Sequence, residues 1–74
     1  MDDDEYRKLS EKIANEICPL LAGHPPQVQG AVLAQLMAMF LAGHYPADAR
    51  QVILDAHLEL VNGLVPVYET MNQN

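Results

Sequence analysis

One seven-residue stretch occurs twice in this chain. Residues 20–26 read LLAGHPP, residues 40–46 read FLAGHYP, and a fainter third copy, LVNGLVP, follows at residues 60–66. A glycine just past the last apolar residue of a helix allows a left-handed turn, and a proline suits the first position of the next helix. The first two copies therefore predict helix, stop and helix, with Gly23 and Gly43 at the stops. They fix an architecture without indicating a chemistry.

Hydrophobic periodicity between these stops predicts three helices, over about residues 3–21, 26–42 and 46–70. Helices joined by turns of three or four residues form an up-down-up bundle. With 74 residues the chain is long enough for one domain, close to the size at which a single core is marginal. We therefore expect an all-α fold, a small up-down-up three-helix bundle, as a single domain over residues 1–74.

The third copy is interpreted as a kink rather than a stop. The apolar phase of the third predicted helix continues unbroken through Gly63 and Pro66, and Pro66 falls on its polar side. The third helix is therefore expected to be long, with a kink at Pro66. The alternative is a tight hairpin turn at Asn62-Gly63 between strands at residues 57–61 and 64–68. Pro66 and the lack of a third strand weigh against that alternative.

The three predicted helices differ in how much apolar surface they present. The first has a stripe of roughly 120°, whereas the apolar arcs of the second and third span roughly 220° and 180–200°. No charged residue occurs between His24 and His44. One chain cannot cover these arcs, unless the alanine face of the second helix simply contacts water, so we expect a homodimer through the second and third helices. The predicted interface comprises Val32, Leu36, Met39, Phe40, Ile53, Leu54, His57 and Val61.

Charge limits the classes of partner. Ten acidic residues stand against four Lys and Arg, which gives a net charge of −6 and excludes nucleic acid and anionic membranes as good partners. The longest apolar run is too short to span a bilayer, and the acidic start Met1–Glu5 is unlike a secretion signal. A cytoplasmic protein is expected. A ridge of carboxylates on the third helix would suit a basic partner protein; it comprises Asp48, Asp55, Glu59 and Glu69.

Four side chains could in principle bind zinc, namely Cys18, His24, His44 and His57. Their spacing matches no metal-binding pattern, and the two turns of such a bundle lie about 25 Å apart, so no metal site is expected. His24 and His44 are interpreted as residues that bond the last carbonyls of the preceding helix. His57 is expected to bond a neighbour on an apolar face, with a pH-sensitive contact as the lesser alternative. Cys18 is interpreted as an exposed thiol.

The sequence contains no signature of catalysis. It has no glycine-rich phosphate loop and no nucleophile elbow, and no pair of carboxylates falls in an apolar cleft. We therefore expect neither enzymatic activity nor a cofactor. Two functional hypotheses remain. The first is a homodimeric interaction or assembly module, and the second is an acidic antagonist of a basic protein, similar in kind to immunity proteins and antitoxins.

Overall fold

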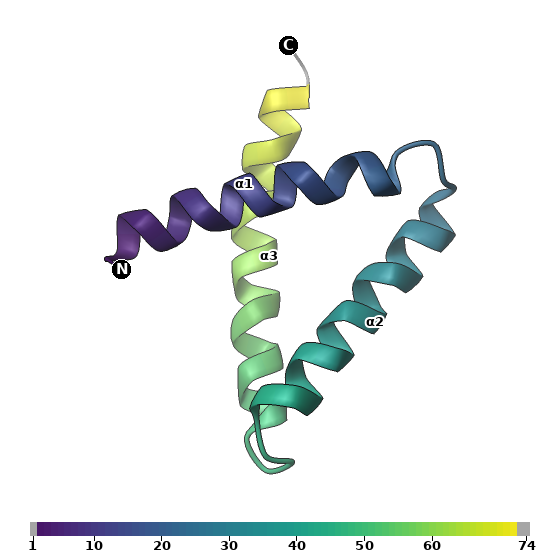
Figure 1. Ribbon diagram of the computed structural model, residues 1–74. Coiled ribbons are helices and arrows are strands. Elements are labelled where there is room, and N and C mark those ends of the chain that lie inside the picture. Colours follow the sequence, from purple (N-terminus) through teal and green to yellow (C-terminus); the bar gives the residue numbers. More distant parts are fainter. Residues whose placement is uncertain (1, 73–74) are drawn as a thin grey trace. The chain divides into compact units, whose positions relative to one another are not determined.

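The computed structural model describes residues 2–72, which form three helices (Figure 1). These are α1 (Asp3–Leu21), α2 (Pro26–His44) and α3 (Arg50–Asn72). No strand occurs within residues 2–72, so the prediction of an all-α fold with three helices is confirmed. The alternative of a hairpin at Asn62-Gly63 is wrong, because α3 continues through both residues and through Pro66. The kink at Pro66 stays a prediction.

The chain divides into two compact units. The N-terminal unit, Met1–Leu33, contains α1 and the first turns of α2, and the C-terminal unit, Ala34–Asn74, contains the rest of α2 and α3. The assignment of residues 1–74 to a single domain stays a prediction.

Helix α1 begins with a side-chain cap. Asp2 has an extended backbone, and its Oδ1 accepts a hydrogen bond of 2.8 Å from the backbone N–H of Glu5. This bond satisfies one of the N–H groups that have no partner inside the helix. Three acids occupy the first turn, where the positive end of the helix dipole favours them. These local interactions explain why α1 starts at the predicted place.

The turn between α1 and α2 has the form that the repeat predicts. The backbone N–H of Ala22 closes the last turn of α1 on the carbonyl of Cys18 at 3.0 Å, and Gly23 then adopts a φ of +85°. Within residues 2–72 only Gly23 has a positive φ, a conformation that costs glycine little. The carbonyl of Pro25 accepts the first bonds of α2, and Pro26 is the first residue of that helix.

The turn between α2 and α3 differs from the prediction at both ends. Helix α2 continues through Gly43 to His44, because the N–H of Tyr45 reaches the carbonyl of Leu41 at 3.2 Å and closes a further turn. Helix α3 begins at Arg50 rather than near residue 46. A separate short turn comes first, in which the N–H of Ala49 bonds the carbonyl of Pro46 at 3.0 Å. The predicted stop at Gly43 is therefore wrong.

No residue from 2 to 72 is buried; the best covered are half-buried. Most of the half-buried side chains lie in the C-terminal unit, on both sides of the turn between α2 and α3. Two helices cover each other from one side only, so a pair leaves its apolar side chains partly open to solvent. Within the same residues, no helix is both long enough and apolar enough to cross a bilayer.

Candidate functional site

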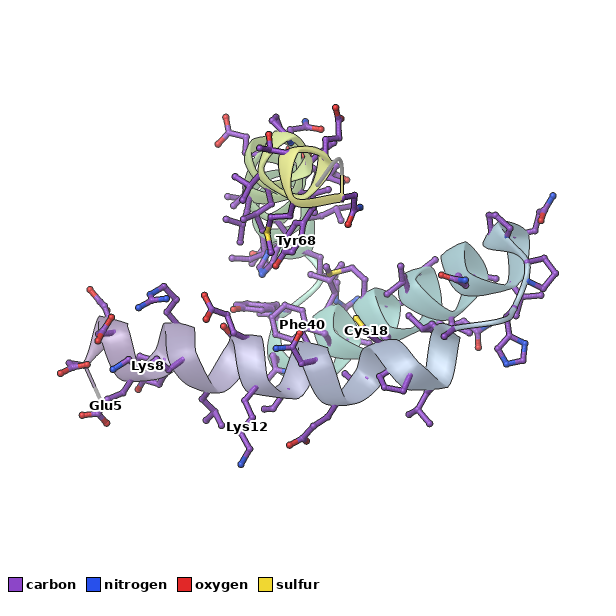
Figure 2. All side chains as sticks on the ribbon, turned by 90° about the horizontal axis from the view of Figure 1, so that it is seen from above. Glu5, Lys8, Lys12, Cys18, Phe40 and Tyr68 are labelled. Atoms are coloured by element: carbon purple, nitrogen blue, oxygen red, sulfur yellow. The ribbon has the colours of Figure 1, made fainter. Side chains whose placement is uncertain are left out.

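Aromatic rings gather around Phe40 near the C-terminal end of α2. Its ring centroid lies 5.2 Å from that of His44, 5.6 Å from that of Tyr45 and 5.4 Å from that of His57. The Tyr45 and His57 rings meet it edge-on, a geometry that aromatic pairs favour. His57 belongs to α3, so this contact joins the two helices of the C-terminal unit. Phe40 is labelled in Figure 2.

Two imidazoles of this cluster are held by backbone carbonyls. Nδ1 of His44 lies 3.0 Å from the carbonyl oxygen of Phe40, and Nδ1 of His57 lies 2.7 Å from that of Ile53. A carbonyl oxygen can only accept, so Nδ1 carries the hydrogen and donates it in both residues. The predicted helix-end bond of His44 and the predicted neighbour bond of His57 are confirmed. Within residues 2–72 the His24 ring makes no such bond, so the predicted helix-end bond of His24 is wrong.

Arg50 also fastens the turn, a role that the sequence did not indicate. Its Nε donates a 3.0 Å hydrogen bond to the carbonyl of Tyr45, and both residues are half-buried. Sequence periodicity indicates no contact for Arg50. The one local signal for this bond is the spacing, because Arg50 has a long side chain and follows the carbonyl of Tyr45, just past the end of α2, by five residues. That signal is weak.

The predicted interface residues fall into two groups. Phe40, Ile53, Leu54 and His57 are half-buried where the C-terminal unit folds on itself, as is Val32 in the N-terminal unit. The other three point outward: Leu36 is 46% exposed, Met39 65% and Val61 49%. The structure brings Phe40 and His57 together within the chain. Only the three outward-pointing side chains of the predicted interface are available for contact with a partner.

A shallow hollow of about 370 Å³ lies on the C-terminal half of α3. We call it the α3 groove; it is lined by Val61, Leu64, Val65, Tyr68, Glu69 and Asn72. All six residues come from one face of one helix, and the four apolar ones are between 41% and 51% exposed. The groove is open and mostly apolar, so it suits a packing partner better than a small polar ligand.

The acidic ridge is exposed along its whole length. Asp55, Glu59 and Glu69 lie on α3, whereas Asp48 lies in the turn before it, because α3 begins later than predicted. No Lys or Arg occurs between residues 51 and 74. Within the described chain these acids form no ion pair, and Asp55 accepts one hydrogen bond of 2.9 Å from Gln51 Nε2. The ridge is thus a negative surface without internal compensation.

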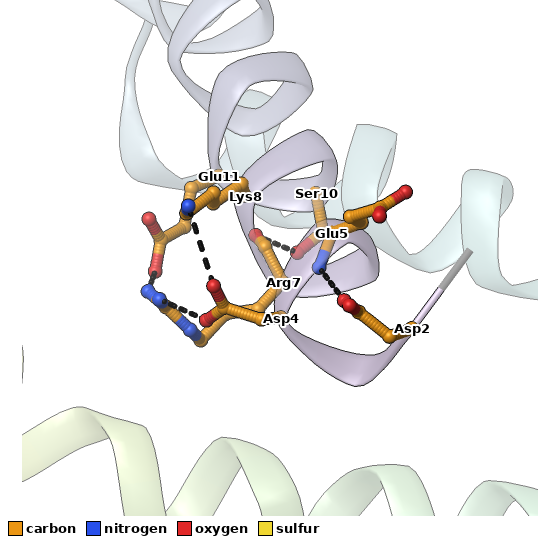
Figure 3. A network of polar contacts seen from close by, with 7 residues as sticks. All are labelled: Asp2, Asp4, Glu5, Arg7, Lys8, Ser10 and Glu11. Carbon is orange, nitrogen blue, oxygen red and sulfur yellow. Dashed lines mark hydrogen bonds and ion pairs between the residues drawn. The ribbon is translucent and has the colours of Figure 1, made fainter.

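In helix α1, by contrast, charged side chains pair with one another (Figure 3). Arg7 pairs with Asp4 at 2.7 Å and with Glu11 at 3.0 Å, and Lys8 pairs with Asp4 at 3.3 Å. Hydrogen bonds from Arg7, and then from Lys8, lower the pKa of the Asp4 carboxyl from its ordinary value. All of these side chains are exposed, so the pairs support the helix only modestly. The Asp4–Lys8 pair has the i,i+4 spacing that favours such contacts on a helix.

Cys18 is exposed, as predicted. Across residues 2–72, no three side chains of His, Cys, Asp or Glu come together in the way a metal ion requires. No protein-family model matches the chain, and neither a curated protein nor a solved structure matches it significantly.

Proposed function

We propose that this protein is a small acidic helical interaction module that assembles as a homodimer through apolar side chains of α2 and α3. The proposal assigns it no catalytic activity and no cofactor. One observation carries it: large apolar side chains of both helices are exposed, among them Met39 at 65% and Leu60 at 59%. Exposed apolar surface of this extent on two neighbouring helices is typical of an interface.

The composition of α2 supports the proposal. Within Pro26–His44 the only ionisable side chain is that of His44, so α2 has no strongly polar face to turn toward water. A helix of this kind is normally surrounded by protein. Helix α1 offers only a narrow apolar stripe as cover, because most of its circumference carries charged and polar residues. A second copy of the chain supplies the missing surface.

Light scattering on the unmodified protein at micromolar concentration tests the proposal. We expect a mass about twice the 8.2 kDa of one chain. Met39→Glu should shift the protein toward monomer, since it places a charge in an apolar contact twice per dimer. Gln35→Glu is the matched control, because it adds the same charge to α2 at a polar position. A mass of one chain at all concentrations would contradict the homodimer.

The acidic ridge favours a second candidate function, an antagonist that binds a basic protein. Complementary charge across such an interface speeds association and makes it sensitive to salt. Reversing all four ridge acids to lysine should slow association with the basic partner protein and weaken the salt dependence of that association. The control reverses four acids of α1 instead, giving the same net charge; these are Asp3, Glu5, Glu11 and Glu16. Equal binding by both variants would eliminate the antagonist hypothesis.

A further inference from the structure

The apolar side chains of α3 follow a coiled-coil spacing. Steps of three and four residues alternate along one face of the helix, which places its side chains in a single seam. The seam consists of Leu54, His57, Val61, Leu64, Tyr68 and Met71. Leu54 and His57 are half-buried, whereas the last four are between 41% and 60% exposed. The seam is therefore partly covered within the chain at its start, and its second half is exposed to solvent.

Helix lengths explain where the cover ends. Residues 34–44 of α2 belong to the C-terminal unit and are about 16 Å long, whereas the whole of α3 is about 35 Å long. In a helical hairpin the residues nearest the turn pair first, so this segment of α2 reaches about as far as residue 60. The part of α3 beyond that point contains the α3 groove.

We propose that a second copy of the chain occupies the α3 groove, so that the α3 part of the dimer interface pairs residues 61–72 of the two copies. This inference rests on the homodimer proposed above. Five apolar side chains are available in and beside the groove, namely Val61, Leu64, Val65, Tyr68 and Met71. At roughly half exposure they offer on the order of 400 Å² per copy. The apolar part of a standard interface is close to this, at about 60% of roughly 800 Å² per partner.

Charge and side-chain size favour an antiparallel pair. In a parallel pair the two Glu69 carboxylates would lie at the same level on the edges of the groove. In an antiparallel pair centred near residue 66 they are separated by about 9 Å along the axis, close to the screening length in physiological salt. This register also matches each larger side chain with a smaller one, Tyr68 with Leu64 and Met71 with Val61. The other ridge acids of α3, Asp55 and Glu59, lie outside the groove.

Cysteine cross-linking tests this register, in a Cys18→Ser background so that the introduced thiol is the only one. A mixture of Leu64→Cys chains and Tyr68→Cys chains should form a mixed disulfide under mild oxidation. Each variant alone should cross-link at least tenfold more slowly. Disulfides need Cα atoms within about 7 Å, and this antiparallel register brings position 64 of one copy opposite position 68 of the other, but neither position opposite its own copy. Glu59→Cys, on the acidic ridge, is the control and should cross-link no faster than either variant alone.

Mutation of the groove provides the second measurement. Tyr68→Glu should raise the dissociation constant of the dimer at least tenfold, whereas Val52→Glu, at a position 69% exposed, should leave it unchanged. A dimer that forms normally in Tyr68→Glu, without mixed disulfides, would overturn this inference and leave the homodimer standing. In a separate Leu64→Cys variant that keeps Cys18, a disulfide within one chain between positions 18 and 64 would also overturn it. A monomeric wild-type protein would overturn both proposals.

Discussion

The two copies of the repeat end their helices in different ways, although they differ only at their first and sixth positions. In the first copy α1 ends at Leu21 and Gly23 turns to a φ of +85°. In the second copy α2 runs through Gly43 and ends at His44. The same glycine-histidine pair thus lies outside a helix in one place and inside a helix in the other.

The sixth position accounts for this difference. Pro25 has no N–H to donate, and it disfavours the helical conformation at His24 before it, so α1 must end earlier. Tyr45 has an N–H, which bonds the carbonyl of Leu41 at 3.2 Å, and its ring contacts Phe40. The next proline, Pro46, restricts Tyr45 rather than His44. We therefore infer that the proline, and not the glycine, decides where each helix ends.

Tyr45→Pro should have the largest effect, because it gives the second copy the Pro-Pro pair of the first. It removes the hydrogen bond to Leu41, restricts His44 and deletes the ring contact with Phe40. We expect a loss of about 3 kcal/mol in the free energy of unfolding. Chemical denaturation measures this loss, and NMR chemical shifts should show α2 ending before Gly43.

The reverse substitution, Pro25→Ala, tests whether the proline of the first copy ends α1. It restores an N–H at position 25 and releases the restriction on His24, so α1 should extend toward Gly23 and His24. Chemical shifts that stay unchanged at residues 22–24 would mean that Gly23, rather than Pro25, ends α1.

The sequence predicted those parts of the fold that depend on neighbouring residues. The start of α1 near Asp3, the turn at Gly23 and the bond of His44 all depend on groups within four residues of one another, so local pattern contains them. The predicted stop at Gly43 is wrong because Tyr45, unlike Pro25, has an N–H that extends the helix past the glycine. The second histidine of the aromatic cluster, His57, meets Phe40 only after two helices have packed. A contact of that kind follows from tertiary structure and has no signal in local periodicity.

The two glycines should respond to alanine with opposite signs. Gly23→Ala forces a side chain into a left-handed conformation and should cost about 1–2 kcal/mol of unfolding free energy. Gly43→Ala lies within α2 and should add about 0.5–1 kcal/mol, since glycine loses more conformational freedom in a helix. A Cβ at either position meets no atom within 4 Å, so steric clash does not complicate the comparison. Thermal or urea unfolding of both variants measures the difference.

The smallest expected difference is between the two histidines of the repeat, His24 and His44. His44→Ala deletes the bond to the Phe40 carbonyl and the ring contact with Phe40, and it should cost about 1 kcal/mol of unfolding free energy. His24→Ala should change stability by less than about 0.5 kcal/mol, because its ring makes no hydrogen bond within the described chain. His44→Asn helps to separate the two contributions, since its side-chain amide can still donate to a carbonyl but has no aromatic ring. Equal losses for His24→Ala and His44→Ala in urea unfolding would show that the aromatic cluster does not distinguish the second turn from the first.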